Sequence, residues 1–135
     1  MPAGSGPSVT RTTGVSVAAA EVVLAVTPVS NWNNPDGLGM LISASVNFTP
    51  GAAQTTTTLR IRQGNGTGGA LVGIAHAVTT VAAAPIELAI DEVDTTAFGN
   101  LQQGGQYTLT AQTNAAGPGT ANAALVELES IAPVL

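Results

Sequence analysis

The chain has 135 residues, the length of a single domain, and it contains no cysteine, which excludes a disulfide framework and a thiolate metal site. Its net charge is −5 with only three arginines and no lysine, so it lacks the clustered cations that bind nucleic-acid phosphates or anionic membranes. Charged residues make up only 8% of the chain, but 44% of its residues are apolar, which excludes disorder for the body of the chain.

The first fourteen residues consist of Gly, Pro, Ser and Thr with a few apolar residues and one Arg. This composition predicts a flexible or extended N-terminal arm over 1–14, followed by one domain over 15–135. The start of the chain has neither the cationic region nor the apolar region of a secretory signal, so we expect no secretion by a signal peptide.

Five segments along the domain alternate apolar and polar residues, which predicts strands with one face in a core. They cover 40–49, 59–62, 86–91, 106–112 and 124–129. Two further segments, Val15–Thr27 and Ala70–Ala77, are continuously apolar, which predicts strands covered on both faces or packed with one face against a partner.

Turn residues separate these strands at short intervals. The run 63–69 is rich in glycine and predicts a hairpin loop, because glycine accepts positive φ angles. Short strands between frequent turns, with no long helical period, predict an all-β fold, an antiparallel sandwich or barrel.

Few residues are candidates for catalysis or metal binding. His76 is the single histidine, and no G-x-S-x-G motif accompanies it, so we expect a structural or surface role. Glu127 and Glu129 share one strand face, which is typical of a solvated sheet. The cluster 91–94 has three carboxylates but lacks the glycine and glutamate of a calcium loop, and we expect a solvated turn. The sequence therefore predicts no catalytic residue, no metal site, no cofactor and no enzymatic activity.

The arginines are the candidate protein-contact residues. Arg60 and Arg62 lie two apart on a predicted strand and so point the same way. They can pair with acidic groups on this chain, on a neighbouring subunit or on a partner, and a solvated sheet face explains them equally well. Arg11, in the predicted arm, is the third candidate.

Two hairpins resemble known architectures. Leu59–Gly64, a glycine-rich turn and Gly69–Gly73 resemble a hairpin of small phage virion proteins with jelly-roll folds. Gly105–Ala111, a Gly/Asn/Pro turn and Thr120–Leu128 are similar to the last hairpin of C1q/TNF-like jelly rolls. The resemblance covers about Leu38 to Ile131, which is most of the chain, and it favours a jelly-roll β-sandwich with an extended N-terminal arm.

The resemblance implies a phage head decoration (cement) protein. Such a protein is commonly a homotrimer on the outer capsid surface, where it bridges copies of the major capsid protein and stabilises the shell. It implies a virion location after synthesis in the host cytoplasm, and it assigns capsid contacts to the arm Met1–Gly14. The low aromatic content, 3%, departs from that family.

Three other functions are compatible with an all-β sandwich. A trimeric receptor- or carbohydrate-binding head of a phage fibre uses the same fold, and Trp32 is then the candidate ligand-contact residue. A small hydrolase requires His76 or the pair Glu127 and Glu129 to be functional. A major shell protein is disfavoured by the low positive charge.

Overall fold

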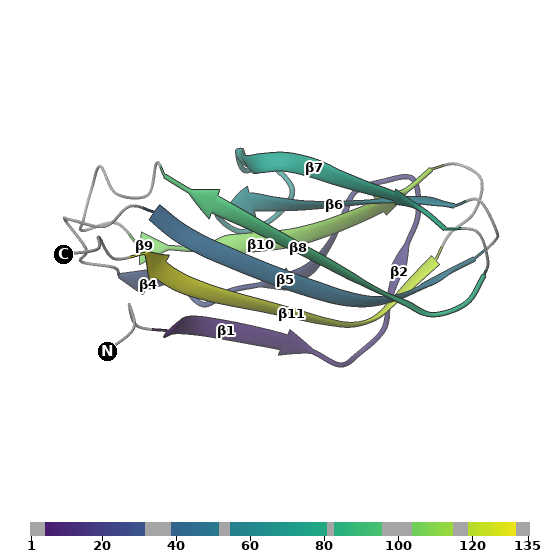
Figure 1. The fold of residues 1–135 in the computed structure, drawn as a ribbon, viewed down its shortest axis with the longest axis horizontal. Helices are drawn as coiled ribbons and strands as arrows, with labels where there is room; N and C mark the ends of the chain where they lie inside the picture. The colour runs from purple at the N-terminus through teal and green to yellow at the C-terminus, as the bar shows by residue number, and fades with distance from the viewer. Residues whose placement is uncertain are drawn as a thin grey trace.

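The computed structural model describes residues 5–31, 39–51, 55–80, 83–95, 104–114 and 119–131. These residues form strands and contain no helix (Figure 1). The strands are β1 (Ser5–Arg11), β2 (Val15–Val17), β3 (Val22–Val26), β4 (Ser30–Asn31), β5 (Gly39–Pro50), β6 (Thr56–Gln63), β7 (Leu71–Thr79), β8 (Ile86–Asp94), β9 (Gly104–Gly105), β10 (Tyr107–Thr113) and β11 (Gly119–Ile131).

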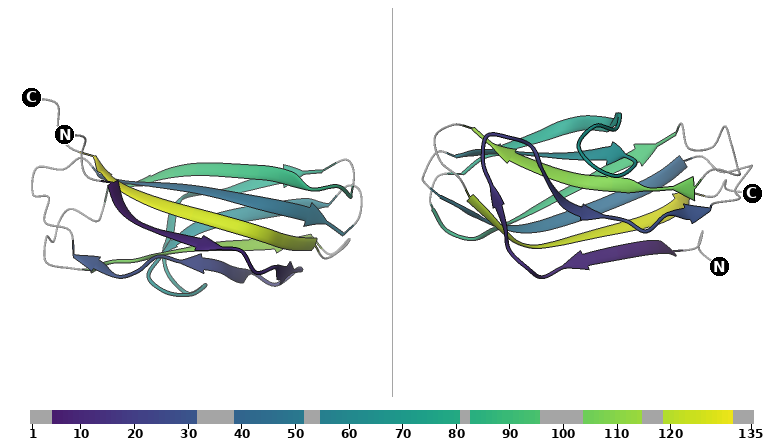
Figure 2. Two further views of the ribbon diagram at one scale, coloured as in Figure 1. Left: turned by 90° about the horizontal axis from the view of Figure 1, so that it is seen from below. Right: turned by 180° about the vertical axis from the view of Figure 1, so that it is seen from behind.

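The long strands form two antiparallel sheets packed face to face (Figures 1 and 2). Sheet A has the order β1-β11-β5-β8, with β2 also paired to β11, and sheet B has the order β3-β10-β6-β7. Most long strands that follow one another in the chain, such as β5 and β6, lie in different sheets, and the hairpin of β6 and β7 within sheet B is the exception. This is the connectivity of a jelly roll, and the predicted all-β antiparallel sandwich is confirmed.

The core lies between the sheets and is built from the alternate residues that the sequence predicts. On β5 the buried residues include Ile42, Val46 and Phe48, each no more than 1% exposed. Across the sheet, Val46 lies between Ala124 of β11 and Leu88 of β8. One face of each strand therefore packs inward, as the period of two requires.

Aliphatic side chains supply most of this core. Phe48 and Tyr107 are the buried rings among the described residues, and the rest of the apolar core consists of Val, Ile, Leu, Ala and Met. A fully buried aliphatic side chain stabilises a fold by about 1.5–3 kcal/mol. Stability consequently rests on many moderate contributions.

The predicted strand Val15–Thr27 is in fact two strands in different sheets. β2 pairs with β11 in sheet A, whereas β3 pairs with β10 in sheet B. Ala18–Ala20 between them are exposed, and Glu21 lies outside the core beside sheet B. The chain crosses here from one sheet to the other, a break that a continuous apolar composition conceals.

Part of the expected N-terminal arm belongs to the sandwich. β1 is extended and pairs with β11, with Val9 opposite Val126 and Arg11 opposite Ala124. Val9 packs against the core. Over these residues the segment is therefore an edge strand and not a free arm, because Val9 faces inward and Thr10 faces outward, which suits a half-buried sheet edge.

The apolar segment on β7 is less covered than its composition predicts. β7 is the edge strand of sheet B, and Ile74 is 64% exposed, with Leu71 and Val78 also exposed. The expectation that this strand is covered on both faces is thus wrong. No helix long and apolar enough to cross a membrane occurs among the described residues.

Candidate functional site

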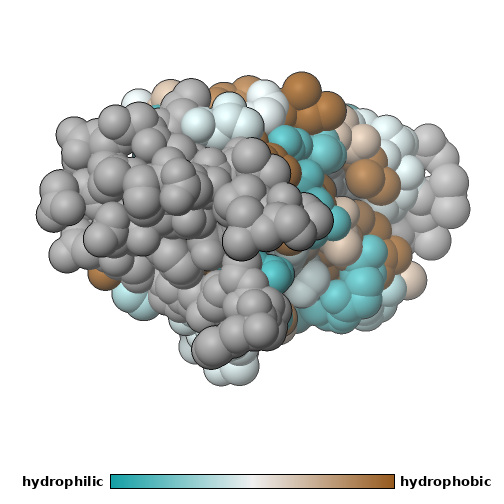
Figure 3. Space-filling view, turned by 60° about the vertical axis from the view of Figure 1, so that its left-hand side comes forward, coloured by the Kyte–Doolittle hydropathy of each residue, from teal (hydrophilic) through white to brown (hydrophobic). Residues whose placement is uncertain are grey.

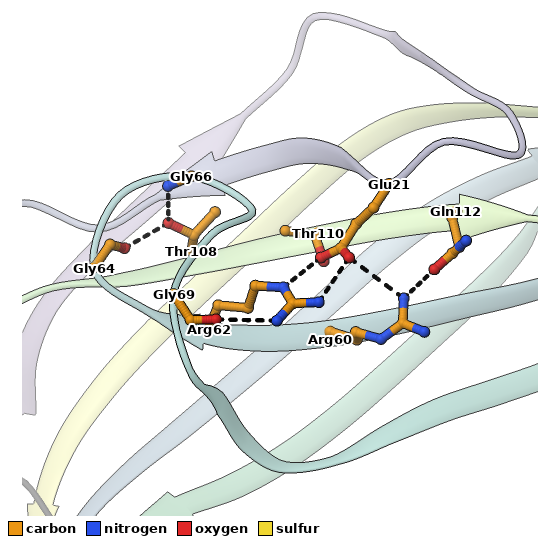
Figure 4. Close-up of polar contacts among 9 residues, drawn as sticks. All are labelled: Glu21, Arg60, Arg62, Gly64, Gly66, Gly69, Thr108, Thr110 and Gln112. Atoms are coloured by element: carbon orange, nitrogen blue, oxygen red, sulfur yellow. Dashed lines mark hydrogen bonds and ion pairs between the residues drawn. The ribbon is translucent and has the colours of Figure 1, made fainter.

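The outer face of sheet B carries a polar network centred on Glu21 (Figure 4). The Arg62 guanidinium donates two hydrogen bonds to the Glu21 carboxylate, from Nε at 2.6 Å and from Nη2 at 2.7 Å. Thr110 on β10 donates to Glu21 Oε2 at 2.5 Å, and Arg60 Nη1 lies 3.7 Å from Oε1. Arg60 also donates to the Gln112 side chain. Three segments are therefore joined by one carboxylate.

This environment favours the ionised form of Glu21. The hydrogen bonds from Arg62 lower the pKa of the carboxyl to about 2, against an opposing effect of burial, with further lowering by Thr110 and Arg60. The same pairing raises the pKa of Arg62. Glu21 and Arg62 are consequently both charged at neutral pH.

The glycine-rich hairpin closes over the neighbouring part of sheet B (Figure 4). Gly66 N donates to Thr108 Oγ1 at 3.0 Å, and Thr108 Oγ1 donates to the Gly64 carbonyl at 2.6 Å. Gly64 and Gly66 have φ angles of 82° and 108°, which glycine adopts readily. The predicted hairpin between strands is confirmed, and it buries Thr108 on the outer side of the sheet.

The three arginines have different surroundings. Arg60 and Arg62 pair with an acidic group on this chain, one of the alternatives that the sequence left open. Arg11 is exposed, and its Nε donates to the Thr13 carbonyl at 3.1 Å. Within the described residues, Arg11 alone among the arginines has no carboxylate partner.

The single histidine lies at the edge formed by β7 and β8. His76 Nε2 contacts Glu92 Oε1, and the backbone N–H of Ile74 donates to the same oxygen at 3.4 Å. Gly73 lies against this carboxylate, and a Cβ atom there would be 1.6 Å from Glu92 Oε2. The contacts hold the irregular part of β7 against β8, which is a structural arrangement.

The acidic cluster over 91–94 is not the solvated turn that we expect from the sequence. It lies on β8, where Asp91 points to the outer face of sheet A and Glu92 and Asp94 point inward. Asp94 is 4% exposed and accepts hydrogen bonds from Tyr107 at 2.8 Å and Gln63 at 3.0 Å. Burial, together with Asp94, raises the pKa of Tyr107. The solvated-turn prediction is wrong because strand β8 does not end at the last apolar residue of its alternating run but continues through the acidic residues to Asp94.

The outer face of sheet A carries exposed carboxylates. Glu127 and Glu129 lie on β11, and Glu87 and Asp91 lie on β8. Glu127 and Asp91 share a row of the sheet, separated by Ser43, which places them about 10 Å apart. None of the four forms an ion pair with another described residue. Figure 3 shows hydrophilic and hydrophobic side chains interleaved on the part of the surface it colours.

The candidates for catalysis are not assembled with one another. His76 lies between the sheets at one edge, while Glu127 and Glu129 lie on the outer face of sheet A. Among the described residues, no three His, Cys, Asp or Glu side chains are grouped as a metal site requires. Trp32 lies outside the described residues.

Comparison with known proteins identifies the fold. No protein-family model and no curated protein sequence matches the chain. Solved structures do match. Eiger TNF from S. frugiperda is 10% identical over 96% of this chain and 96% of its own, with a TM-score of 0.52. The xylan-binding module CBM15 is 9% identical over 95% of this chain and 88% of its own, with a TM-score of 0.50.

A third similar structure comes from the viral particle of infectious bursal disease virus, at 14% identity and a TM-score of 0.53. It matches over 93% of this chain, and the chain spans 32% of the viral protein. At these identities the likeness establishes the jelly-roll sandwich fold alone. A viral-particle protein, a TNF and a xylan-binding module thus share the fold, and function has to be argued from the surfaces.

Proposed function

We propose that this chain is a virion structural protein that decorates and stabilises the outer surface of a phage capsid by bridging capsid subunits, and that it is not an enzyme. The observation that carries the proposal is the distribution of charge on the two outer faces. On sheet B, Arg60 and Arg62 both pair with the single carboxylate of Glu21 within the chain, which leaves one positive charge in this cluster. On sheet A, four exposed carboxylates have no cationic partner among the described residues.

A broad face of this kind suits contact with another protein. The small side chain of Ser43 lies between Glu127 and Asp91, so these two carboxylates are not covered by the residue between them. Complementary charge steers association and fixes its register. The acidic face therefore favours a basic or polar surface as its partner, and we propose that the major capsid protein supplies it.

Self-association into a homotrimer is part of the proposal. Exposed apolar side chains lie on the two edge strands at one side of the sandwich, at Leu71, Ile74 and Val78 of β7 and Val93 of β8. In Figure 3 hydrophobic surface lies along the upper rim, the side on which β7 runs in Figure 1. Light scattering would test this assembly: Ile74→Asp should shift a trimer toward the monomer, and a monomeric wild type contradicts the proposal.

Capsid binding provides the direct test. Purified phage capsids that lack this protein are incubated with it, sedimented, and heated to measure their loss. We expect the wild-type protein to co-sediment and to protect the capsids. The double variant Glu127→Gln with Asp91→Asn should bind at least several-fold more weakly, and binding by the wild type should weaken as salt screens the charges.

A control variant distinguishes the effect of the sheet A carboxylates on capsid binding from the effect of the protein's net charge. Thr67→Arg changes the net charge in the same direction, but Thr67 is exposed in the glycine-rich hairpin beside sheet B, so capsid binding should be preserved. If wild-type protein never binds, or bound capsids are no more robust than bare ones, the decoration function is wrong.

A trimeric receptor- or carbohydrate-binding head of a phage fibre is the second candidate. The fold that the chain shares with the xylan-binding module CBM15 favours it. Selective binding on a glycan array that Trp32→Ala abolishes would support this function in place of decoration.

A further inference from the structure

A groove runs along the side of the sandwich opposite β7 and β8. It lies between β1, the edge of sheet A, and β3, the edge of sheet B, which contact one another along this side (Figure 2). Its volume is about 430 Å³, and its lining includes Val9 on one strand and Leu24 and Val26 on the other. Arg11 and Thr13 lie in its wall at one end. The groove is therefore apolar along part of its length and cationic at its end.

Arg11 faces the same side of β1 as Val9. Val9 pairs with Val126 and Arg11 with Ala124, and both partners on β11 are buried inward-facing residues. Thr10 lies between them and pairs with Leu125, which belongs to the outer face. An apolar and a cationic side chain are thus two residues apart on the groove side of one strand.

The guanidinium of Arg11 has N–H groups that donate no hydrogen bond to another described residue. Its Nε is held by the Thr13 carbonyl, and no other contact of this group is found among the described residues. Of the described residues that line the groove, none carries a carboxylate. An arginine fork binds a carboxylate through two parallel hydrogen bonds. Charge complementarity therefore favours an acidic group as the occupant of this end.

The backbone of β1 can hold such an occupant. β1 is an edge strand, so one side of its backbone has no neighbouring strand in sheet A within the part of the chain that the structure describes. Pro7 has no N–H to donate, which leaves Ser8–Arg11 as the stretch that can accept an added strand. Strand addition to a free sheet edge is a common mode of peptide recognition.

We propose that this groove binds an extended segment of a partner protein by strand addition to β1, and that the segment carries an apolar side chain and a carboxylate two residues apart. The spacing follows from β1 itself, because an added strand has the same period of two. The apolar residue then packs over Val9, which is only partly buried, and the carboxylate reaches Arg11. The inference is independent of the proposed capsid function.

A second copy of this chain is a poorer occupant. The pattern occurs on the edge strand β8 at Ile90 and Glu92, but Ile90 is buried and Glu92 contacts His76 within its own subunit. Asp91 and Val93 repeat it on the outer face of sheet A. In a continuous sheet those two side chains would point away from the groove.

Binding of short peptides to the intact chain tests the proposal. The probe is a blocked peptide of alternating Thr residues with Val and Glu two positions apart, compared with one that has Gln for Glu and one with Val and Glu adjacent. Amide chemical shifts report binding and its location. We expect shifts over 8–13 and 24–26, and about tenfold tighter binding of the first peptide than of the other two.

Two variants locate the source of the preference. Arg11→Gln should bind the Glu and Gln peptides equally, whereas Arg60→Gln, which removes the same charge from the outer face of sheet B, should keep the tenfold preference. Unchanged spectra elsewhere show that each variant is folded. Failure of the Glu peptide to bind, equal binding of all three peptides, or a preference that survives Arg11→Gln overturns the proposal. Concentration-dependent self-association that Arg11→Gln abolishes also overturns it, since a second copy then occupies the groove.

Discussion

Replacing Glu21 by Gln removes the charge that joins three segments on the outer face of sheet B. The pKa of Glu21 is lowered from 4.5 to about 2 in the folded protein, and about 1.4 kcal/mol per unit sets a ceiling of about 3 kcal/mol. The side chain is 16% exposed, so solvent screens part of this energy. We expect Glu21→Gln to lower the free energy of unfolding by about 1–2 kcal/mol at neutral pH.

The decrease in the free energy of unfolding caused by Glu21→Gln should depend on pH in a way that identifies its cause. A carboxyl group whose pKa is lower in the folded state stabilises the fold above the pKa of the unfolded state, and that stabilisation disappears as the pH falls through the folded value. The difference between wild type and Glu21→Gln should therefore be constant above about pH 5.5 and shrink as the pH falls from about 4.5 toward 2.

Urea unfolding followed by circular dichroism at several pH values measures both quantities. Glu129→Gln is the matched control, because Glu129 is exposed on the outer face of sheet A, with no ion pair to another described residue. It should change stability by no more than about 0.5 kcal/mol. Equal effects of the two variants, or a loss in Glu21→Gln that persists unchanged at pH 2, would refute the reasoning.

Two further substitutions test the rest of the fold. Gly73→Ala should destabilise the protein by about 1–3 kcal/mol, because φ at Gly73 is +70° and the added Cβ would meet the Glu92 carboxylate, whereas Gly68→Ala, in open space, should be nearly neutral in the same denaturation assay. Tyr107 is the only tyrosine, and burial raises the pKa of its hydroxyl, so absorbance at alkaline pH should show no tyrosinate until the protein unfolds. Tyr107→Phe should cost about 1–3 kcal/mol by removing a donor to buried Asp94; tyrosinate in the folded protein near pH 10 would contradict this account.

The strands of this fold were largely predictable because the alternation of apolar and polar residues that marks a strand lies within the strand's own sequence. The alternation over 40–49 and 86–91 predicts β5 and β8 without reference to any partner. Strand boundaries were harder to predict from the sequence where the chain passes from one sheet to the other. Nothing in the apolar run 15–27 marks Ala18–Ala20 as the crossing, since that boundary depends on pairing with β10 and β11, about 100 residues away.

The polar clusters were predictable only in part, for the same reason. Spacing alone places Arg60 and Arg62 on one face, but their partner Glu21 lies about 40 residues earlier, in a segment that reads as apolar strand. Asp94 resembles a loop residue in sequence. It is tolerated in the interior because Tyr107 and Gln63 donate to it, and only the folded arrangement brings these donors together.

The acidic face is proposed to bind its partner through carboxylates, whereas the Arg11 groove is proposed to bind its partner through a cation. Substitutions at the two surfaces therefore test the two proposals separately. Neutralising Glu127 and Asp91 should weaken capsid binding and leave the peptide preference intact, because both carboxylates point away from the groove. Arg11→Gln should abolish the peptide preference and leave capsid binding through sheet A intact. If instead Arg11→Gln reduces both, the capsid protein itself supplies the extended acidic segment, and the groove and the acidic face form one contact surface.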